Sequence, residues 1–267
     1  MTIKVAVHGA AGRMGRTVVQ LVHEAADLSL AAAIDSPGSP LLGRDAGELA
    51  GVAASGITVS SDLAQLASAD VVIDFSLPVA LPRLFDHLQE KPLPLVLATT
   101  GVDAPLWARV DELAKRLPLV AAPNYSLGVA VLCHLAEQAA ALLPGFDLEI
   151  IEMHHRNKVD APSGTALGLL DAAARGRGQD GRAHAVFGRQ GHPGARSDAE
   201  IGVMTLRGGD VIGDHTLMLA GPGERLELSH RASNRALFAH GALRAARFLV
   251  GKAPGRYTMP QVLGLTR

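Results

Sequence analysis

The chain has 267 residues, of which 48% are hydrophobic, and a formal net charge of −1 at pH 7. This length and apolar content suit one large domain or two ordinary ones, and we expect two. A charge so close to zero gives no broad electrostatic attraction to nucleic acid or to an anionic membrane. Any binding site for an anion therefore has to be local.

A single cysteine, Cys133, excludes an internal disulfide framework, and its apolar neighbours favour a buried thiol over a nucleophile. The N-terminal run 1–7 lacks the charged region, apolar region and cleavage site of a signal peptide. No stretch reaches the roughly 20 uninterrupted apolar residues that a membrane helix needs. We therefore expect a cytoplasmic protein.

The first motif is a strand, a glycine turn and a helix. Residues 3–8 predict a buried strand and residues 17–22 the body of a helix. Glycines let a phosphate approach the backbone closely, and the helix N-terminus stabilises a pyrophosphate, so this order predicts a dinucleotide site. The Gly-x-x-Gly-x-x-Gly spacing is not the commonest, and a tight turn without a ligand is the alternative. The candidate contacts are Gly9, Ala10, Ala11, Gly12, Arg13 and Met14.

The rest of the first half alternates between predicted strands and helices. Strands are expected at 28–34, 71–76, 94–98 and 119–122, and helices from about 78 and at 105–116. This alternation predicts an α/β fold with a Rossmann-like parallel sheet. Asp35 ends the second strand about 20 residues after the glycine turn, where an acidic side chain accepts hydrogen bonds from the adenosine ribose. Ala98, Thr99 and Thr100 end a later strand and are placed to line the nicotinamide half of the site.

The second half predicts an α+β domain. A nearly uncharged helix at 127–143 precedes a strand at 148–152, and a final helix is expected at 236–250. Three alternating runs at 201–207, 215–220 and 224–230 predict antiparallel strands, after a loop with a short strand at 183–187. These runs contain more apolar side chains than one layer of helices is expected to cover, so we expect the protein to self-associate through this sheet. These side chains are Val203, Leu206, Leu217, Leu219, Leu226 and Leu228.

The densest group of chemically active side chains follows the strand at 148–152. Residues 152–158 bring together two imidazoles, a guanidinium and an ammonium, and Ser163-Gly164-Thr165 then opens a helix. Positive side chains beside the N–H groups of a helix start predict a receptor for a small molecule with more than one carboxylate. Each part also has an ordinary interpretation, with Ser163 as an N-cap, Pro162 as a turn residue and solvated histidines.

Residues 152–166, together with the glycine turn, resemble the 4-hydroxy-tetrahydrodipicolinate (dihydrodipicolinate) reductase family of lysine and diaminopimelate synthesis. The resemblance runs nearly end to end and includes the segment 41–48. It implies NADH- or NADPH-dependent reduction of an unsaturated six-membered ring that carries two carboxylates. It also implies a homotetramer, and a substrate-binding and oligomerisation domain at 127–235 inserted into a dinucleotide-binding domain of residues 1–126 plus 236–267.

The resemblance also assigns roles to residues. Lys158 is the expected proton donor, and His154 either handles a proton or orients the substrate. His155 is placed on one substrate carboxylate and the backbone N–H groups of Gly164 and Thr165 on the other, whereas Arg156 faces solvent. No metal is expected. Further cofactor contacts are carried over to Ala122, Pro123, Asn124 and Tyr125.

Ser36 follows Asp35 where many family members have a basic residue, which favours NADH over NADPH. Arg13 or Arg16 could still reach a phosphate.

Two alternative functions remain. Another two-domain NAD(P)-dependent amino-acid or sugar dehydrogenase would explain the first half but not the Lys158 and Ser163 motifs. A non-enzymatic dinucleotide-sensing regulator would need a DNA-binding module or an interaction tail, and neither is evident.

Overall fold

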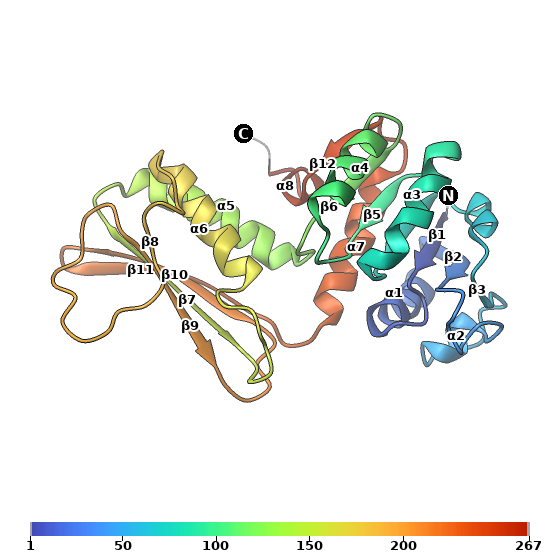
Figure 1. Ribbon diagram of the computed structural model, residues 1–267, viewed down its shortest axis with the longest axis horizontal. Helices are drawn as coiled ribbons and strands as arrows, with labels where there is room; N and C mark the ends of the chain where they lie inside the picture. The colour runs from blue at the N-terminus through green and yellow to red at the C-terminus, as the bar shows by residue number, and fades with distance from the viewer. Residues whose placement is uncertain (1, 266–267) are drawn as a thin grey trace. The chain divides into compact units, whose positions relative to one another are not determined.

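A computed structural model describes residues 2–265 (Figure 1). The chain forms two compact units. One comprises the residues up to Ser126 together with those from Ala236 onward, and the other comprises Leu127–Arg235. What each unit binds remains a prediction. No helix in the described part of the chain has the length and apolar character to cross a membrane.

The first unit is built on a seven-stranded sheet in the order β12-β6-β5-β4-β1-β2-β3. Every neighbouring pair is parallel, which confirms the predicted Rossmann-like sheet. The two edge strands have two or three residues each, too few to give a recognisable alternation, and were not predicted. The strands are β1 (Ile3–His8), β2 (Leu28–Ile34), β3 (Val59–Ser60), β4 (Val71–Asp74), β5 (Leu95–Leu97), β6 (Pro118–Ala121) and β12 (Gly255–Tyr257).

Helices cover this sheet. Apolar side chains of α3 and α4, among them Phe85 and Leu113, are fully buried in a common core with strand residues such as Leu95. Helix α7 packs on α1 and on β4, β5 and β6, so the chain returns to the first unit after the second one. The helices are α1 (Arg13–Glu24), α2 (Ala46–Leu49), η1 (Leu63–Ser68), η2 (Pro78–Ala80), α3 (Leu81–Glu90), α4 (Ala104–Ala114), α7 (Ala236–Leu249) and α8 (Met259–Val262).

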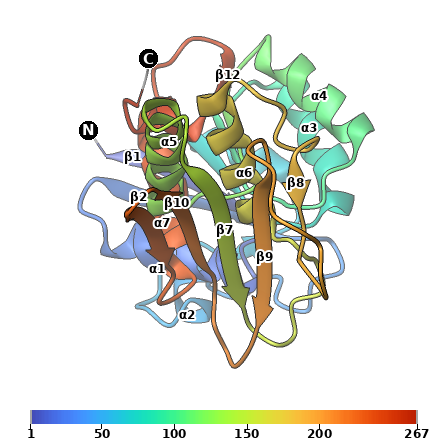
Figure 2. The ribbon, with the colours of Figure 1, turned by 90° about the vertical axis from the view of Figure 1, so that its left-hand side faces the viewer.

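The second unit has a five-stranded sheet in the order β11-β10-β7-β9-β8, which Figure 2 shows face on. Strand β9 runs parallel to β7, so the prediction that all three later runs are antiparallel was wrong for β9. The long connection through α6 lets the chain return in the same direction, as parallel pairing requires. The elements are α5 (Leu127–Leu142), β7 (Asp147–His154), α6 (Gly164–Arg177), β8 (Ala185–Val186), β9 (Ile201–Arg207), β10 (Asp214–Gly221) and β11 (Glu224–Arg231).

Burial alternates strictly along β7, with even-numbered residues inward. Leu148 and Ile150 pack in the core of this unit with apolar residues of α5 and α6. The apolar sheet residues that were predicted as one group lie in different environments. Val203, Leu217 and Leu219 are buried, whereas Leu206 is 49% and Leu226 is 39% exposed.

Candidate active site

Strand β7 positions the first two side chains of the candidate site. The strand ends at His154 and not at Glu152 as the apolar pattern predicted, because both residues are paired in the sheet. The alternation that buries Leu148 and Ile150 continues, so Glu152 and His154 also point inward. Polar side chains that occupy core positions in this way have to find partners.

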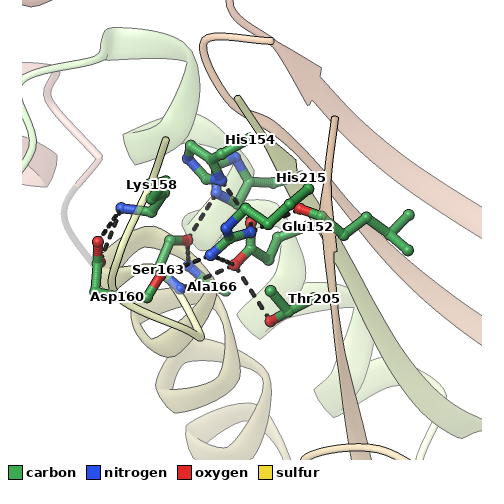
Figure 3. Close-up of polar contacts among 10 residues, drawn as sticks. Glu152, His154, Lys158, Asp160, Ser163, Ala166, Thr205 and His215 are labelled. Atoms are coloured by element: carbon green, nitrogen blue, oxygen red, sulfur yellow. Dashed lines mark hydrogen bonds and ion pairs between the residues drawn. The ribbon is translucent and has the colours of Figure 1, made fainter. Parts of the chain in front are cut away.

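The Glu152 carboxylate is completely buried and connects four other residues (Figure 3). Its Oε2 accepts hydrogen bonds from Nδ1 of His154 at 2.5 Å and from Nη1 of Arg207 at 3.0 Å. Its Oε1 accepts from the backbone N–H of Ser163 at 3.0 Å and from the Thr205 hydroxyl at 3.3 Å. Burial raises the pKa of Glu152, but the bonds from Arg207 and His154 outweigh it and hold that pKa below the ordinary value.

His154 is oriented by this carboxylate. Burial lowers the pKa of His154 below its ordinary 6.5, and the hydrogen bond to Glu152 opposes that shift only in part. The neutral ring therefore carries its proton on Nδ1, facing the ionised Glu152, and Nε2 is an acceptor. A Cβ added at Gly213 would lie 3.0 Å from Nε2, so the glycine leaves space at this acceptor.

Lys158 lies in the loop after β7 and already contacts a carboxylate. Its Nζ is 2.7 Å and 2.8 Å from the two oxygens of Asp160, and the lysine side chain is only 18% exposed. Arg207 donates to the Asp160 carbonyl at 2.6 Å, which ties this loop to the Glu152 network. The ammonium is thus held in a geometry in which it binds a carboxylate.

The other predicted substrate contacts lie in the same loop and at the start of α6. His155 is partly buried, and its carbonyl accepts from the Lys158 N–H at 3.1 Å. Gly164 and Thr165 are the first two residues of α6, where amides precede the first intrahelical hydrogen bonds. Arg156 is exposed, in agreement with the expectation that it faces solvent.

His215 on β10 was missed by the motif search. Its side chain is 3% exposed, and Nε2 lies 3.1 Å from the Ser163 hydroxyl. Its ring also meets the His154 ring edge on, with centroids 5.2 Å apart. Burial and the neighbouring His154 lower the pKa of His215 to about 4. Its place on the inward face of an alternating run was the only sequence signal, and that signal also fits a core histidine.

In the first unit, the glycine turn packs closely against the backbone that follows β4. Gly9 has a φ of +80°, and a Cβ there would lie 2.8 Å from the Phe75 carbonyl. Gly12 is the N-cap of α1, and no side-chain hydrogen bond caps this helix. Arg16 donates to the Ala11 carbonyl at 2.9 Å and therefore braces the turn. Arg13 is exposed at the first position of α1.

Asp35 holds the turn from the end of β2. Its Oδ2 accepts from the Ala11 N–H and its Oδ1 from the Ser36 N–H, both at 2.8 Å. A cavity of about 200 Å³ lies beside it, lined among others by His8, Ser36 and Arg83. This end of the sheet can therefore take a polar ligand next to Asp35.

A buried network lies at the ends of β1, β4 and β5. Asp74 is completely buried and accepts from Nδ1 of His8 at 2.6 Å and from the Thr99 hydroxyl at 2.5 Å. Ala98 and Thr99 are buried, and Thr100 is exposed. The Thr99 hydroxyl is thus engaged within the protein, and a cofactor contact at this position would fall to its backbone.

In the segment after β6, as at Thr99, the side chains are engaged within the protein. Tyr125 is 2% exposed, and its hydroxyl oxygen lies 2.9 Å and 2.8 Å from the carbonyl oxygens of Leu97 and Val120, which share its single proton. The Asn124 side chain accepts from the Ser126 N–H at 2.8 Å. Ala122 and Pro123 follow directly on β6, at the carboxyl end of the sheet. The Tyr125 side chain is a packing element, so only its backbone remains for a ligand.

Known proteins match this chain over nearly its whole length. The family model described as dihydrodipicolinate reductase, N-terminus, matches residues 3–125, and the model for the C-terminus matches 128–263. The 4-hydroxy-tetrahydrodipicolinate reductases of Alkalilimnicola ehrlichii and Thiobacillus denitrificans are each 51% identical over 267 residues, covering 99% of this chain and 100% of theirs.

A solved structure agrees with the sequence matches. The dipicolinate-bound dihydrodipicolinate reductase from Paenisporosarcina sp. TG-14 is 26% identical, with a TM-score of 0.75, and the match covers 97% of this chain and 98% of that one. The family consists of NAD(P)H-dependent reductases with a Rossmann-like fold, in the pathway of lysine and diaminopimelate synthesis. The two family models, the two relatives and the shared fold together show that this chain belongs to the dihydrodipicolinate reductase family.

Proposed function

We propose that this protein catalyses the NAD(P)H-dependent reduction of 4-hydroxy-tetrahydrodipicolinate to tetrahydrodipicolinate, in diaminopimelate and lysine synthesis. Relatives with about half of their residues identical carry that activity in their names. The observation that carries the proposal is that one buried glutamate contacts both His154 and the start of α6, and that Lys158 lies near enough to His154 to contribute to its lowered pKa. Another amino-acid or sugar dehydrogenase would not need this arrangement.

The substrate is a dicarboxylate, and the site offers two kinds of anion contact. Lys158 already binds the carboxylate of Asp160, and a substrate carboxylate can compete for the same ammonium. The amides of Gly164 and Thr165 stand at the positive end of the α6 dipole and receive the second carboxylate. His155 borders this loop and supplies a further contact to the first carboxylate.

Proton transfer is assigned to Lys158. Its ammonium is largely screened from solvent, so a substrate ring held beside it can receive its proton. His154 is neutral at pH 7, because burial lowers its pKa, and it presents Nε2 as an acceptor. We assign His154 to orienting the 4-hydroxy substrate through its Nε2 acceptor.

The 4-hydroxyl group of the substrate first leaves as water, and a reduced nicotinamide, when bound, would supply the hydride to the unsaturated ring that results. The residues proposed to hold the dinucleotide are the glycine turn Gly9–Met14 for the pyrophosphate and Asp35 for the ribose hydroxyls. The residues after β5 and β6 serve the nicotinamide half. The Asp35 carboxylate would repel a 2′-phosphate, and Ser36 adds no cation, so we propose a preference for NADH. Arg83 lines the same cavity and is the cation that would allow NADPH to bind.

We further propose a cytoplasmic homotetramer that assembles through the second unit. Its sheet exposes Leu206 at 49% and Leu226 at 39%, and burying such side chains is favourable. Sedimentation velocity of the wild type and of a Leu206→Asp, Leu226→Asp double variant tests this assembly. A wild-type monomer would contradict it.

The function is tested by cofactor oxidation, followed at the nicotinamide absorbance. Purified protein is mixed with NADH or NADPH and with 4-hydroxy-tetrahydrodipicolinate generated in the cuvette. We expect oxidation only when this substrate is present, and competitive inhibition by dipicolinate. Oxidation with an amino acid's imino form or a sugar ketone instead, and none with this substrate, would overturn the proposal.

A further inference from the structure

His215 is the one buried ionisable side chain of the site that the proposed chemistry does not use. It comes from β10, far along the chain from the loop, and points at the cap of α6 (Figure 3). Its Nε2 is 3.1 Å from the Ser163 oxygen, and its Nδ1 is buried without a hydrogen-bond partner among the described residues. A buried polar atom without a hydrogen-bond partner costs free energy of folding, so its presence in the site calls for an explanation.

The direction of the bond between His215 and Ser163 follows from the protons available. Burial keeps the pKa of His215 low, so the ring carries one proton at neutral pH. A proton on Nδ1 would be a buried N–H without an acceptor, which is rarer in proteins than an unsatisfied acceptor. The proton therefore belongs on Nε2, which donates to the Ser163 oxygen.

This direction restricts the Ser163 hydroxyl to one further role, as a hydrogen-bond donor. Its oxygen already accepts from the Ala166 N–H at 3.1 Å as the N-cap of α6. A second accepted bond, from Nε2 of His215, uses both lone pairs of that oxygen. The hydroxyl proton is then used by neither neighbour and can be donated to another acceptor at the start of α6. An acceptor that approaches this end of α6 thus meets the Ser163 hydroxyl as a donor.

We infer that His215 is a positioning residue that turns the Ser163 hydroxyl into a dedicated hydrogen-bond donor for the substrate carboxylate bound at the start of α6. This inference rests on the proposed function, because it needs a carboxylate at that place. Without His215, the Ser163 hydroxyl is free to rotate, and the start of α6 should bind a carboxylate less tightly.

The inference is tested by dipicolinate binding in the presence of saturating NADH, measured by titration calorimetry. His215→Leu removes the donor and should weaken dipicolinate binding about 10- to 100-fold, the span for one hydrogen bond to a charged group. His215→Gln places an amide N–H near the position of Nε2 and should restore most of the affinity. NADH affinity should stay unchanged in both, and Thr216→Val on the same strand is the matched control.

A double-mutant cycle with Ser163→Ala shows whether His215 acts through Ser163. In the Ser163→Ala background, His215→Leu should change dipicolinate affinity less than threefold. If His215→Leu folds poorly, His215→Gln carries the test, together with ¹⁵N spectra of labelled histidine, which should place the His215 proton on Nε2.

The outcomes separate this inference from the proposed function. Wild-type protein that neither binds dipicolinate nor oxidises NADH with the substrate would remove the proposed function. Tight wild-type binding with equal affinity in His215→Leu, or a His215 proton found on Nδ1, would overturn the role of His215 alone. Equal losses from His215→Leu with and without Ser163 would show that His215 does not act through the serine.

Discussion

Nδ1 of His154 lies 2.5 Å from Oε2 of Glu152, and both side chains point into the core of the second unit. The Glu152 carboxylate is shielded from solvent, so its negative charge interacts with His154 and Arg207 and not with water. In this pair the glutamate sets which nitrogen of His154 carries the proton, as an aspartate does for the histidine of serine proteases.

We predict that Glu152→Gln lowers kcat by at least about tenfold, because the amide can present its N–H to His154 and favour the wrong tautomer. It also removes the negative charge with which Arg207 pairs, which should cost about 1–3 kcal/mol of unfolding free energy. Urea denaturation and steady-state kinetics measure the two effects. Thr205→Val removes another bond to the same carboxylate without changing its charge and should have the smaller effect on both. A kcat near that of the wild type in Glu152→Gln would contradict this role.

Lys158→Ala should reduce turnover by about two to four powers of ten, the usual span for the loss of a general acid. NADH binding, measured by fluorescence titration, should remain near normal, because Lys158 is assigned to the substrate. Arg156→Ala serves as the control, since that exposed side chain in the same loop should be dispensable. Undiminished turnover in Lys158→Ala would remove this lysine from the mechanism.

Asp35→Ala should weaken NADH binding more than NADPH binding. The substitution removes an acceptor for the ribose hydroxyls and, at the same time, a negative charge that repels a 2′-phosphate. It also releases the Ala11 amide, so both cofactors should lose some affinity. Arg83→Gln is the complementary variant, in which NADPH alone should bind less well. Titration of each variant with both cofactors decides, and equal losses of NADH and NADPH in Asp35→Ala would contradict the ribose assignment.

Stability should fall when the pH is lowered from about 6.5 to about 4. The pKa of His215 drops from 6.5 in the unfolded chain to about 4 in the folded protein, so the unfolded chain binds more protons in this window. The stabilisation is complete above pH 6.5 and is lost as the pH falls through the folded pKa, by about 3 kcal/mol in total. Burial lowers the pKa of His154 too, which adds a loss in the same direction.

The pH dependence is measured from urea unfolding free energies at several pH values between 7 and 4. His215→Gln is the matched variant, because glutamine does not titrate. Its unfolding free energy should decline less steeply than that of the wild type across this window. Identical slopes for the two proteins would show that His215 does not stay neutral in the folded state.

Much of the fold could be predicted from local patterns. The bounds of β1, β2 and β9 agree with the predicted strands, because apolar runs or alternation bounded by polar or glycine-rich turns leave little ambiguity. The glycine turn and the Ser163 cap were predicted for the same reason, since each is decided by a few neighbouring residues. The edge strands β3 and β12 were missed, because runs of two or three residues carry no period.

Sequence alone determined the family, the Rossmann-like sheet and the segment from His154 through Lys158 to Gly164, since these depend on residues close together in the chain. Only the tertiary structure decided which groups surround that loop. Strand β7 lies between β9 and β10, and this order brings Arg207, Thr205 and His215 to the same end of α6. Contacts between residues 50 or more positions apart are set by strand order and register, and no local pattern encodes them.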